Sequence, residues 1–99
     1  MEIYEVIFKR KLENEFKKLP KHVISKLLAW IDAVRHHGLG QVRKIPGFHD
    51  EPLKGNRKGQ RSIRLSKSYR AIYIISSRDE MELVEIKEVN KTMMPYCIN

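Results

Sequence analysis

Two amphipathic helical stripes that meet at one proline constrain the fold of this chain more than any other feature. The first stripe, Leu12, Phe16 and Leu19, has the spacing of one helix face, and Pro20 ends it. Pro20 also suits the first turn of a second helix that closes at Gly38. The apolar face of this second helix consists of Val23, Leu27, Ile31 and Val34, broadened by Ile24, Leu28 and Trp30. The sequence therefore predicts a helical hairpin whose aromatic and leucine side chains pack into a core.

Segments rich in β-branched and aromatic residues lie on both sides of this hairpin. One precedes it at residues 3–8, and three follow it at residues 61–65, 69–75 and 82–89. The links at residues 66–68 and 76–81 are short enough for hairpins, so these three strands are predicted to form an antiparallel meander that the first strand joins. Residues 1–99 are thus predicted to form a single α+β domain, in the order β-α-α-β-β-β, with the helical hairpin on a small, mainly antiparallel twisted sheet.

Several function classes are disfavoured by the composition. The lone Cys97 gives no disulfide framework, and the four histidines lack metal-ligand spacing. No glycine pattern matches a phosphate-binding Walker loop. The apolar runs are too short to span a membrane, and the first residues lack the apolar region of a signal peptide. We therefore expect a cytoplasmic protein with no metal, no small-molecule cofactor and no membrane partner.

The net charge of +8 is confined to one part of the chain. Residues 43–78 contain ten Lys or Arg against Asp50 and Glu51, whereas the remainder contains ten basic and ten acidic residues. A confined positive field raises the local concentration of phosphate-rich partners. Charge alone is equally compatible with a basic loop that binds nothing, so the pattern inside the segment has to decide.

Two arginines of this segment lie on predicted strands. Ile63 and Leu65 share one face of their strand, so Arg64 is predicted on the opposite face. Arg70 lies on an otherwise apolar strand, where a guanidinium is costly without a partner or a ligand. Two interpretations of Arg70 remain open here: a ligand-binding role, or an ion pair with a neighbouring carboxylate, for which the candidates are Glu82, Glu85 and Glu88.

A loop with many glycines and prolines, residues 38–59, precedes these strands. In it the carboxylate of Glu51 lies beside the cations Lys54, Arg57 and Lys58. A carboxylate in such surroundings is a candidate proton acceptor.

The run Glu51-Pro52-Leu53-Lys54, then Asn56, Gly59, Ser62 and Arg64, and the strand Tyr69-Arg70-Ala71-Ile72-Tyr73 resemble the toxins of bacterial type II toxin–antitoxin pairs in the RelE/YoeB/HigB superfamily, within the wider RelE/ParE group. The resemblance extends over nearly the whole chain. It implies a RelE-like fold, a cognate antitoxin as partner, and metal-independent cleavage of mRNA on the ribosome. In that reaction the ribose 2′-OH attacks the adjacent phosphate.

The resemblance also implies roles for individual residues. Glu51 falls where the YoeB branch has its carboxylate base, and Arg70 matches the arginine that stabilises charge on the phosphate. Arg64 and Tyr96 fall at further active-site positions, with Tyr96 placed to stack on a base or to shape the environment of the leaving group. Contacts to RNA or the ribosome are implied for Lys54 and Lys91. We expect the same contacts from the other cations of the basic segment, Arg57, Lys58 and Arg61.

The chain departs from the family pattern near its C-terminus. Thr92-Met93-Met94-Pro95 intervene where many relatives have a histidine or arginine and then a tyrosine, and Ser62 replaces a lysine. The general acid is therefore left open between His49 and Tyr96. Two other functions also remain open: a ParE-like, non-catalytic inhibitor of DNA gyrase on the same fold, and a plain basic nucleic-acid-binding module.

Overall fold

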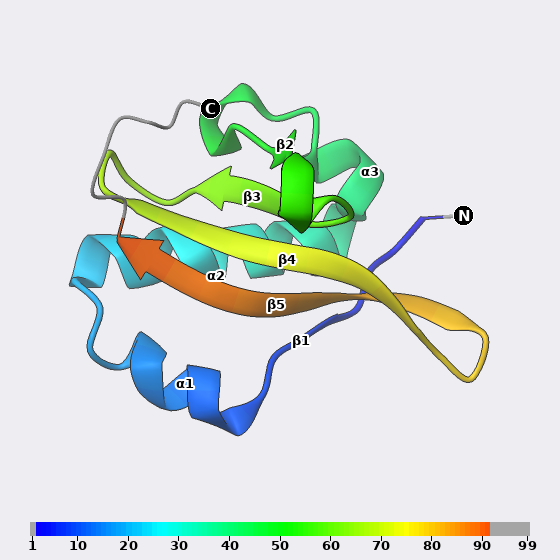
Figure 1. Cartoon of the computed structure of the whole chain (residues 1–99), viewed down its shortest axis with the longest axis horizontal. Coiled ribbons are helices and arrows are strands. Elements are labelled where there is room, and N and C mark those ends of the chain that lie inside the picture. Colours follow the sequence, from blue (N-terminus) through cyan, green and yellow to red (C-terminus); the bar gives the residue numbers. More distant parts are fainter. Residues whose placement is uncertain (1, 92–99) are drawn as a thin grey trace.

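The predicted helical hairpin is present in the computed structural model, which describes residues 2–91 (Figure 1). Helix α1 spans Arg10–Phe16 and helix α2 spans Lys21–His37. Pro20 is the N-cap of α2 with φ −58°, and Gly38 ends α2 with φ 90°, a left-handed value that favours glycine. The predicted boundaries of the second helix are confirmed, whereas α1 ends before Pro20 because residues 17–19 form a turn.

A five-stranded sheet lies beside these helices, with the spatial order β1-β5-β4-β3-β2. Its strands are β1 Val6–Ile7, β2 Glu51–Pro52, β3 Arg61–Arg64, β4 Tyr69–Arg78 and β5 Met81–Lys91. β1 runs parallel to β5, and the other neighbouring pairs are antiparallel. The predicted α+β class, the meander and the addition of the first strand to the same sheet are confirmed.

The strand lengths differ from the prediction at both ends of the chain. β1 has only two residues because the carbonyl of Ile3 accepts a hydrogen bond from the Leu39 N–H at 2.8 Å, so this part of the chain bonds outside the sheet. β4 and β5 are longer than predicted because only Asp79 and Glu80 turn between them. Their φ values of 51° and 69° are both positive, as in the two-residue turns that match the twist of a hairpin.

Residues 38–59, predicted as one long loop, contain short elements. They are α3 Leu39–Val42, the 3₁₀ turns η1 Pro46–Phe48 and η2 Gly55–Arg57, and β2. Leu39, Val42 and Phe48 are buried in the core, which anchors the first half of the segment. Lys26 of α2 also holds η1: its Nζ lies 5.1 Å from the centre of the Phe48 ring and donates to the Gly47 carbonyl at 3.4 Å. The predicted loop therefore contains short helical elements packed on the core in this half.

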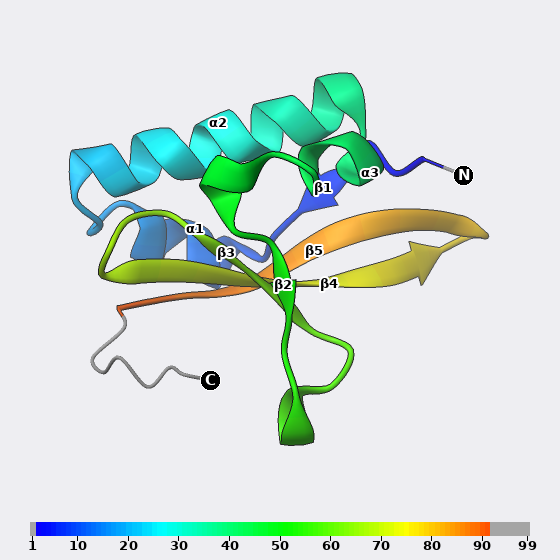
Figure 2. The same cartoon turned by 90° about the horizontal axis from the view of Figure 1, so that it is seen from above.

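The molecule has two layers, with α2 and α3 covering one face of the sheet (Figure 2). Between them lies the core, in which the rings of Trp30 and Tyr73 pack with centroids 5.1 Å apart. Phe16, Leu27 and Trp30 all pack in or against this core, as predicted. The segment carrying β2 and η2 crosses the edge of the sheet, and η2 lies on the side away from α2 (Figure 2). The opposite face of the sheet therefore lies next to the basic loop.

Candidate nucleic-acid interface and active site

The sheet face directed away from α2 is called the open face here. Residues alternate between the two faces of a strand, so the core positions Ile63, Ala71 and Tyr73 place their neighbours on the open face. Cross-strand pairing arranges these neighbours in two adjacent rows. The first row contains Glu51, Ser62, Ile72 and Glu88, and the second contains Arg64, Arg70 and Asn90.

Arg64 and Arg70 are direct cross-strand partners in the second row. Like charges in this position repel, because directly opposed side chains start from Cβ atoms only about 5 Å apart. The Arg70 guanidinium donates from Nη1 to Ser62 Oγ at 2.7 Å, and no ion pair joins it to a carboxylate of residues 2–91. The ion pair with Glu82, Glu85 or Glu88 is thus not formed within this part of the chain. Two opposed arginines are an arrangement that an anion would stabilise.

Ser62 lies between Arg70 and Glu51 on the open face. The serine is fully buried although it lies on the open face, and Glu51 of β2 is its cross-strand partner. The exposed Glu51 therefore lies one strand away from the hydroxyl that Arg70 contacts. The structure brings Glu51, Arg64 and Arg70 onto one face of the sheet.

Asp50, next to Glu51 in the chain, points to the other side and is fully buried. Its Oδ1 accepts from Arg61 Nε at 2.6 Å, and its Oδ2 accepts from the Tyr73 hydroxyl at 2.5 Å. Burial raises the pKa of Tyr73, and the bond to Asp50 raises it further. For Arg61 burial acts against the charged form, but the bond and the charge of Asp50 outweigh it and raise its pKa.

Arg61 therefore does not share the surface of the other predicted RNA contacts. It lies on the core-facing side of β3 and is engaged by a buried carboxylate, with 21% of its side chain exposed. We correct its assignment from a nucleic-acid contact to a residue that fixes β2 against β3. The sequence already indicated this position, because Arg61 alternates in step with Ile63 and Leu65 and therefore shares their core-facing side of the strand.

The loop cations lie around η2, and all three are exposed. Lys54 is the N-cap of η2, Lys58 follows it, and Arg57 reaches across to β5. Its Nη2 donates to Glu88 Oε2 at 2.8 Å, and Glu88 Oε1 accepts from Asn90 Nδ2 at 2.6 Å. Glu88 and Asn90 were not predicted as parts of the site. A bulge in β5 between the partners of Ile72 and Tyr73 shifts the alternation, so their face could not be assigned from periodicity.

The remaining predicted residues lie at the margins. His49 is exposed, with a left-handed φ of 48°, and follows η1. Lys91 is exposed at the end of β5, opposite Tyr69. Tyr96 lies outside the described residues.

The described part of the chain offers neither a metal site nor a membrane-spanning helix. No group of three or more His, Cys, Asp or Glu within residues 2–91 is placed to hold a metal ion. In the same residues, no helix has the length and apolar character needed to cross a membrane.

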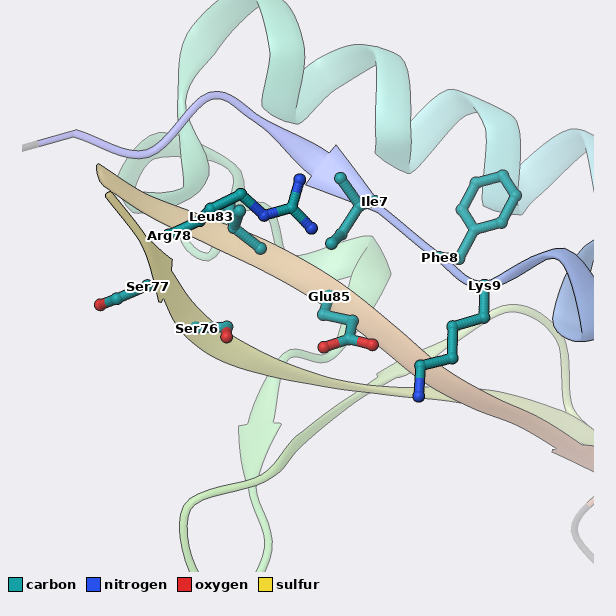
Figure 3. A pocket seen from close by; sticks show the side chains of 8 residues that line it. All are labelled: Ile7, Phe8, Lys9, Ser76, Ser77, Arg78, Leu83 and Glu85. Carbon is teal, nitrogen blue, oxygen red and sulfur yellow. The ribbon is translucent and has the colours of Figure 1, made fainter. Parts of the chain in front are cut away.

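A hollow of about 370 Å³ lies at the far end of the sheet, between β1, β4 and β5 (Figure 3). Lys9, Arg78 and Glu85 give it mixed charge, and Ile7 and Leu83 form apolar walls. None of its lining residues belongs to the two rows around Arg70. We therefore place the candidate site on the open face, which carries the carboxylate of Glu51 and the guanidinium groups of Arg64 and Arg70, and not in this hollow.

Comparison with known proteins places the fold. No family model matches the sequence, and no curated protein matches it. Among solved structures, YafQ from E. coli strain BL21(DE3) superposes with a TM-score of 0.66 at 14% identity, over 96% of this chain and 98% of that one. A chain of the archaeal RelE–RelB complex from Pyrococcus horikoshii OT3 gives a TM-score of 0.64 at 21% identity, over 89% of this chain and 93% of that one. The toxin–antitoxin complex RelBE2 from Mycobacterium tuberculosis gives 0.61 at 24% identity, over 90% and 98%.

The architecture is thus that of a class of small α+β toxins. More particularly, this chain has the RelE-like fold that the RelE, YoeB and YafQ structures share.

Proposed function

We propose that this chain is the toxin of a type II toxin–antitoxin pair and that it cuts mRNA as a ribosome-dependent endonuclease. One observation supports the reaction most directly: the opposed arginines Arg64 and Arg70, without a carboxylate partner for Arg70 in residues 2–91, beside the exposed Glu51. Phosphate is the anion that such an arginine pair suits, because each guanidinium binds it through two parallel hydrogen bonds.

In the proposed reaction Glu51 accepts the proton of the ribose 2′-OH. The 2′-oxygen then forms a bond to the adjacent phosphorus while the bond from phosphorus to the 5′-oxygen breaks, which yields a cyclic phosphate and a free 5′-hydroxyl. Arg70 and Arg64 stabilise the negative charge that gathers on the phosphate oxygens in the transition state. The departing 5′-oxygen takes a proton from a general acid, for which His49 and Tyr96 remain the candidates.

The proposed partners follow from charge and fold. The excess of cations in residues 43–78 suits rRNA and mRNA, since docking on a polyanion releases counterions. Several solved structures with this fold are complexes with an antitoxin: RelB, YefM or DinJ. We propose a cognate antitoxin for this chain too, a single RelE-like domain over residues 1–99, and action in the cytoplasm.

The test is induced expression in a bacterial host followed by primer extension on translated mRNA. We expect translation to stop and cuts to appear, and we expect Glu51→Gln and Arg70→Ala to abolish both effects. Arg78→Ala is the matched control, because it removes one exposed cation from the tip of the β4–β5 hairpin, away from both rows. Growth arrest with intact mRNA in the wild type would contradict the proposal.

A second function is kept because one structure with this fold, at a TM-score of 0.64 and 16% identity, is described as a YoeB/ParE toxin from Agrobacterium tumefaciens. A ParE-like protein would inhibit DNA gyrase without cutting RNA. DNA breakage and induction of the SOS response with intact mRNA would favour this alternative.

A further inference from the structure

The ion pair between Arg57 and Glu88 joins two segments that are far apart in the sequence. Arg57 belongs to η2, on the loop beside the open face, and Glu88 lies on β5 in the same row as Glu51. The ion pair, with Nη2 and Oε2 2.8 Å apart, therefore connects the loop to β5 on the open face, and Glu88 lies in the row next to Arg64 and Arg70.

Both oxygens of Glu88 are engaged. Oε2 accepts from Arg57, and Oε1 accepts from Asn90 at 2.6 Å. Asn90 is in turn the cross-strand partner of Arg70. A carboxylate that accepts from a guanidinium and an amide presents the same two-oxygen pattern as a phosphodiester, whose unesterified oxygens are also paired acceptors.

We propose that Glu88 occupies a second phosphate subsite of the open face in the free protein, and that an RNA phosphate displaces it and takes over Arg57. This inference rests on the proposed function, since the ligand is the RNA strand whose scissile phosphate lies at Arg64 and Arg70. Residues two apart on a strand are separated by about 7 Å. Neighbouring phosphates of an RNA strand are spaced similarly, so the two rows suit consecutive phosphates.

The ion pair between Arg57 and Glu88 is weak enough for an RNA phosphate to replace the carboxylate. The side chains of Arg57 and Glu88 are 45% and 34% exposed, and exposed ion pairs stabilise a protein only weakly. A phosphodiester can therefore compete for Arg57. The displaced carboxylate of Glu88 remains near the RNA, and its negative charge repels the phosphates and weakens binding.

A double-mutant cycle in a binding assay tests the proposal. The probe is a short fluorescent 2′-O-methyl RNA, which cannot be cut because it lacks the 2′-OH, and the readout is its dissociation constant at fixed ionic strength. We expect Glu88→Gln to bind roughly threefold to tenfold more tightly than the wild type, because Arg57 becomes available for a charge-assisted bond to phosphate. Arg57→Ala should weaken binding by the wild type, because the phosphate loses its partner, and should remove most of the gain in the Glu88→Gln background.

Glu85→Gln is the matched control. It removes one carboxylate from the same strand and the same face, but Glu85 pairs with Lys87 at 3.6 Å and lines the hollow between β1, β4 and β5. An equal gain in Glu85→Gln, or a gain from Glu88→Gln that persists without Arg57, would overturn the subsite and leave RNA binding intact. Absence of binding by the wild type and by Glu88→Gln would overturn the subsite, whereas the RNA-cutting function is decided separately by primer extension on translated mRNA.

Discussion

The hydroxyl of Tyr73 donates to the buried carboxylate of Asp50 at 2.5 Å, across a sequence separation of 23 residues. This bond ties the entry to β2 to the central strand β4. β2 has only two residues and pairs only through Glu51 and Pro52, so its ladder alone holds it weakly. Asp50 is therefore the anchor that fixes where Glu51 emerges on the open face.

Tyr73→Phe tests this anchor. It leaves Asp50 Oδ2 buried without its donor, and we expect the free energy of unfolding to fall by about 1–3 kcal/mol. Urea unfolding followed by circular dichroism measures the difference. Tyr4→Phe, at a half-exposed position, is the control and should change the stability little. Equal stability of Tyr73→Phe and the wild type would show that the bond does not anchor β2.

The raised pKa of Tyr73 predicts a loss of stability in alkali. Burial and Asp50 keep the hydroxyl protonated in the folded protein above pH 10, where the unfolded chain begins to lose this proton. The unfolded state then binds fewer protons than the native state, so its free energy falls relative to the fold as the pH rises. Stability should be unaffected by this group below pH 10 and should decline above it.

Other groups titrate in the same range, so the informative quantity is the difference between two proteins. The decline from about pH 9 to about pH 11 should be steeper for the wild type than for Tyr73→Phe. Parallel stability curves would mean that Tyr73 ionises equally in both states.

Neutralising the consecutive carboxylates Asp50 and Glu51 should have different effects: the first change lowers stability, and the second lowers the rate of cleavage. Asp50→Asn weakens the bonds to Arg61 and Tyr73, and we expect a loss of about 2–3 kcal/mol in stability. Glu51→Gln changes an exposed group and should leave stability unchanged while it lowers the rate of RNA cleavage by about 10²–10⁴. Unfolding curves and single-turnover cleavage on programmed ribosomes measure the two effects. A Glu51→Gln protein that cuts at the wild-type rate would remove it as the base.

The sequence was sufficient for features governed by local periodicity and far less informative where distant segments meet. Pro20, Gly38 and the alternation around Ile63 predicted the hairpin and the face of Arg64, because each acts within a few residues. The bond from Tyr73 to Asp50 depends on tertiary packing, and the face of Glu88 depends on a bulge that no composition signal marks. Burial of Leu39, Val42 and Phe48 likewise ordered a segment whose glycines and prolines indicated a loop.

Arg70→Ala should abolish cleavage without unfolding the protein. Removal of a donor that stabilises transition-state charge costs about 10²-fold or more in rate. The fold should persist because, within residues 2–91, the guanidinium makes one side-chain hydrogen bond, to Ser62, and its loss relieves repulsion with Arg64. Arg70→Lys keeps the charge but not the two-pronged geometry, so it should restore only part of the rate. Full activity in Arg70→Lys would mean that charge alone suffices, and a loss of stability in Arg70→Ala would show a structural role for Arg70 instead.

The confined positive charge predicts that docking on the ribosome weakens steeply with salt. Each phosphate contact releases condensed counterions, so the logarithm of the association constant should fall linearly with the logarithm of the salt concentration, at about 0.7–0.9 per contact. Replacing Lys54 or Lys58 with Gln should reduce this slope by about one contact, because both are exposed beside the open face. Arg61→Gln should leave the slope unchanged, since Arg61 is bound to the buried Asp50, and should lower stability. Sedimentation with ribosomes over a salt series measures the slopes. A flat dependence for the wild type would exclude phosphate contacts as the basis of docking. A slope for Arg61→Gln as low as that for Lys54→Gln would show that Arg61 does contact RNA.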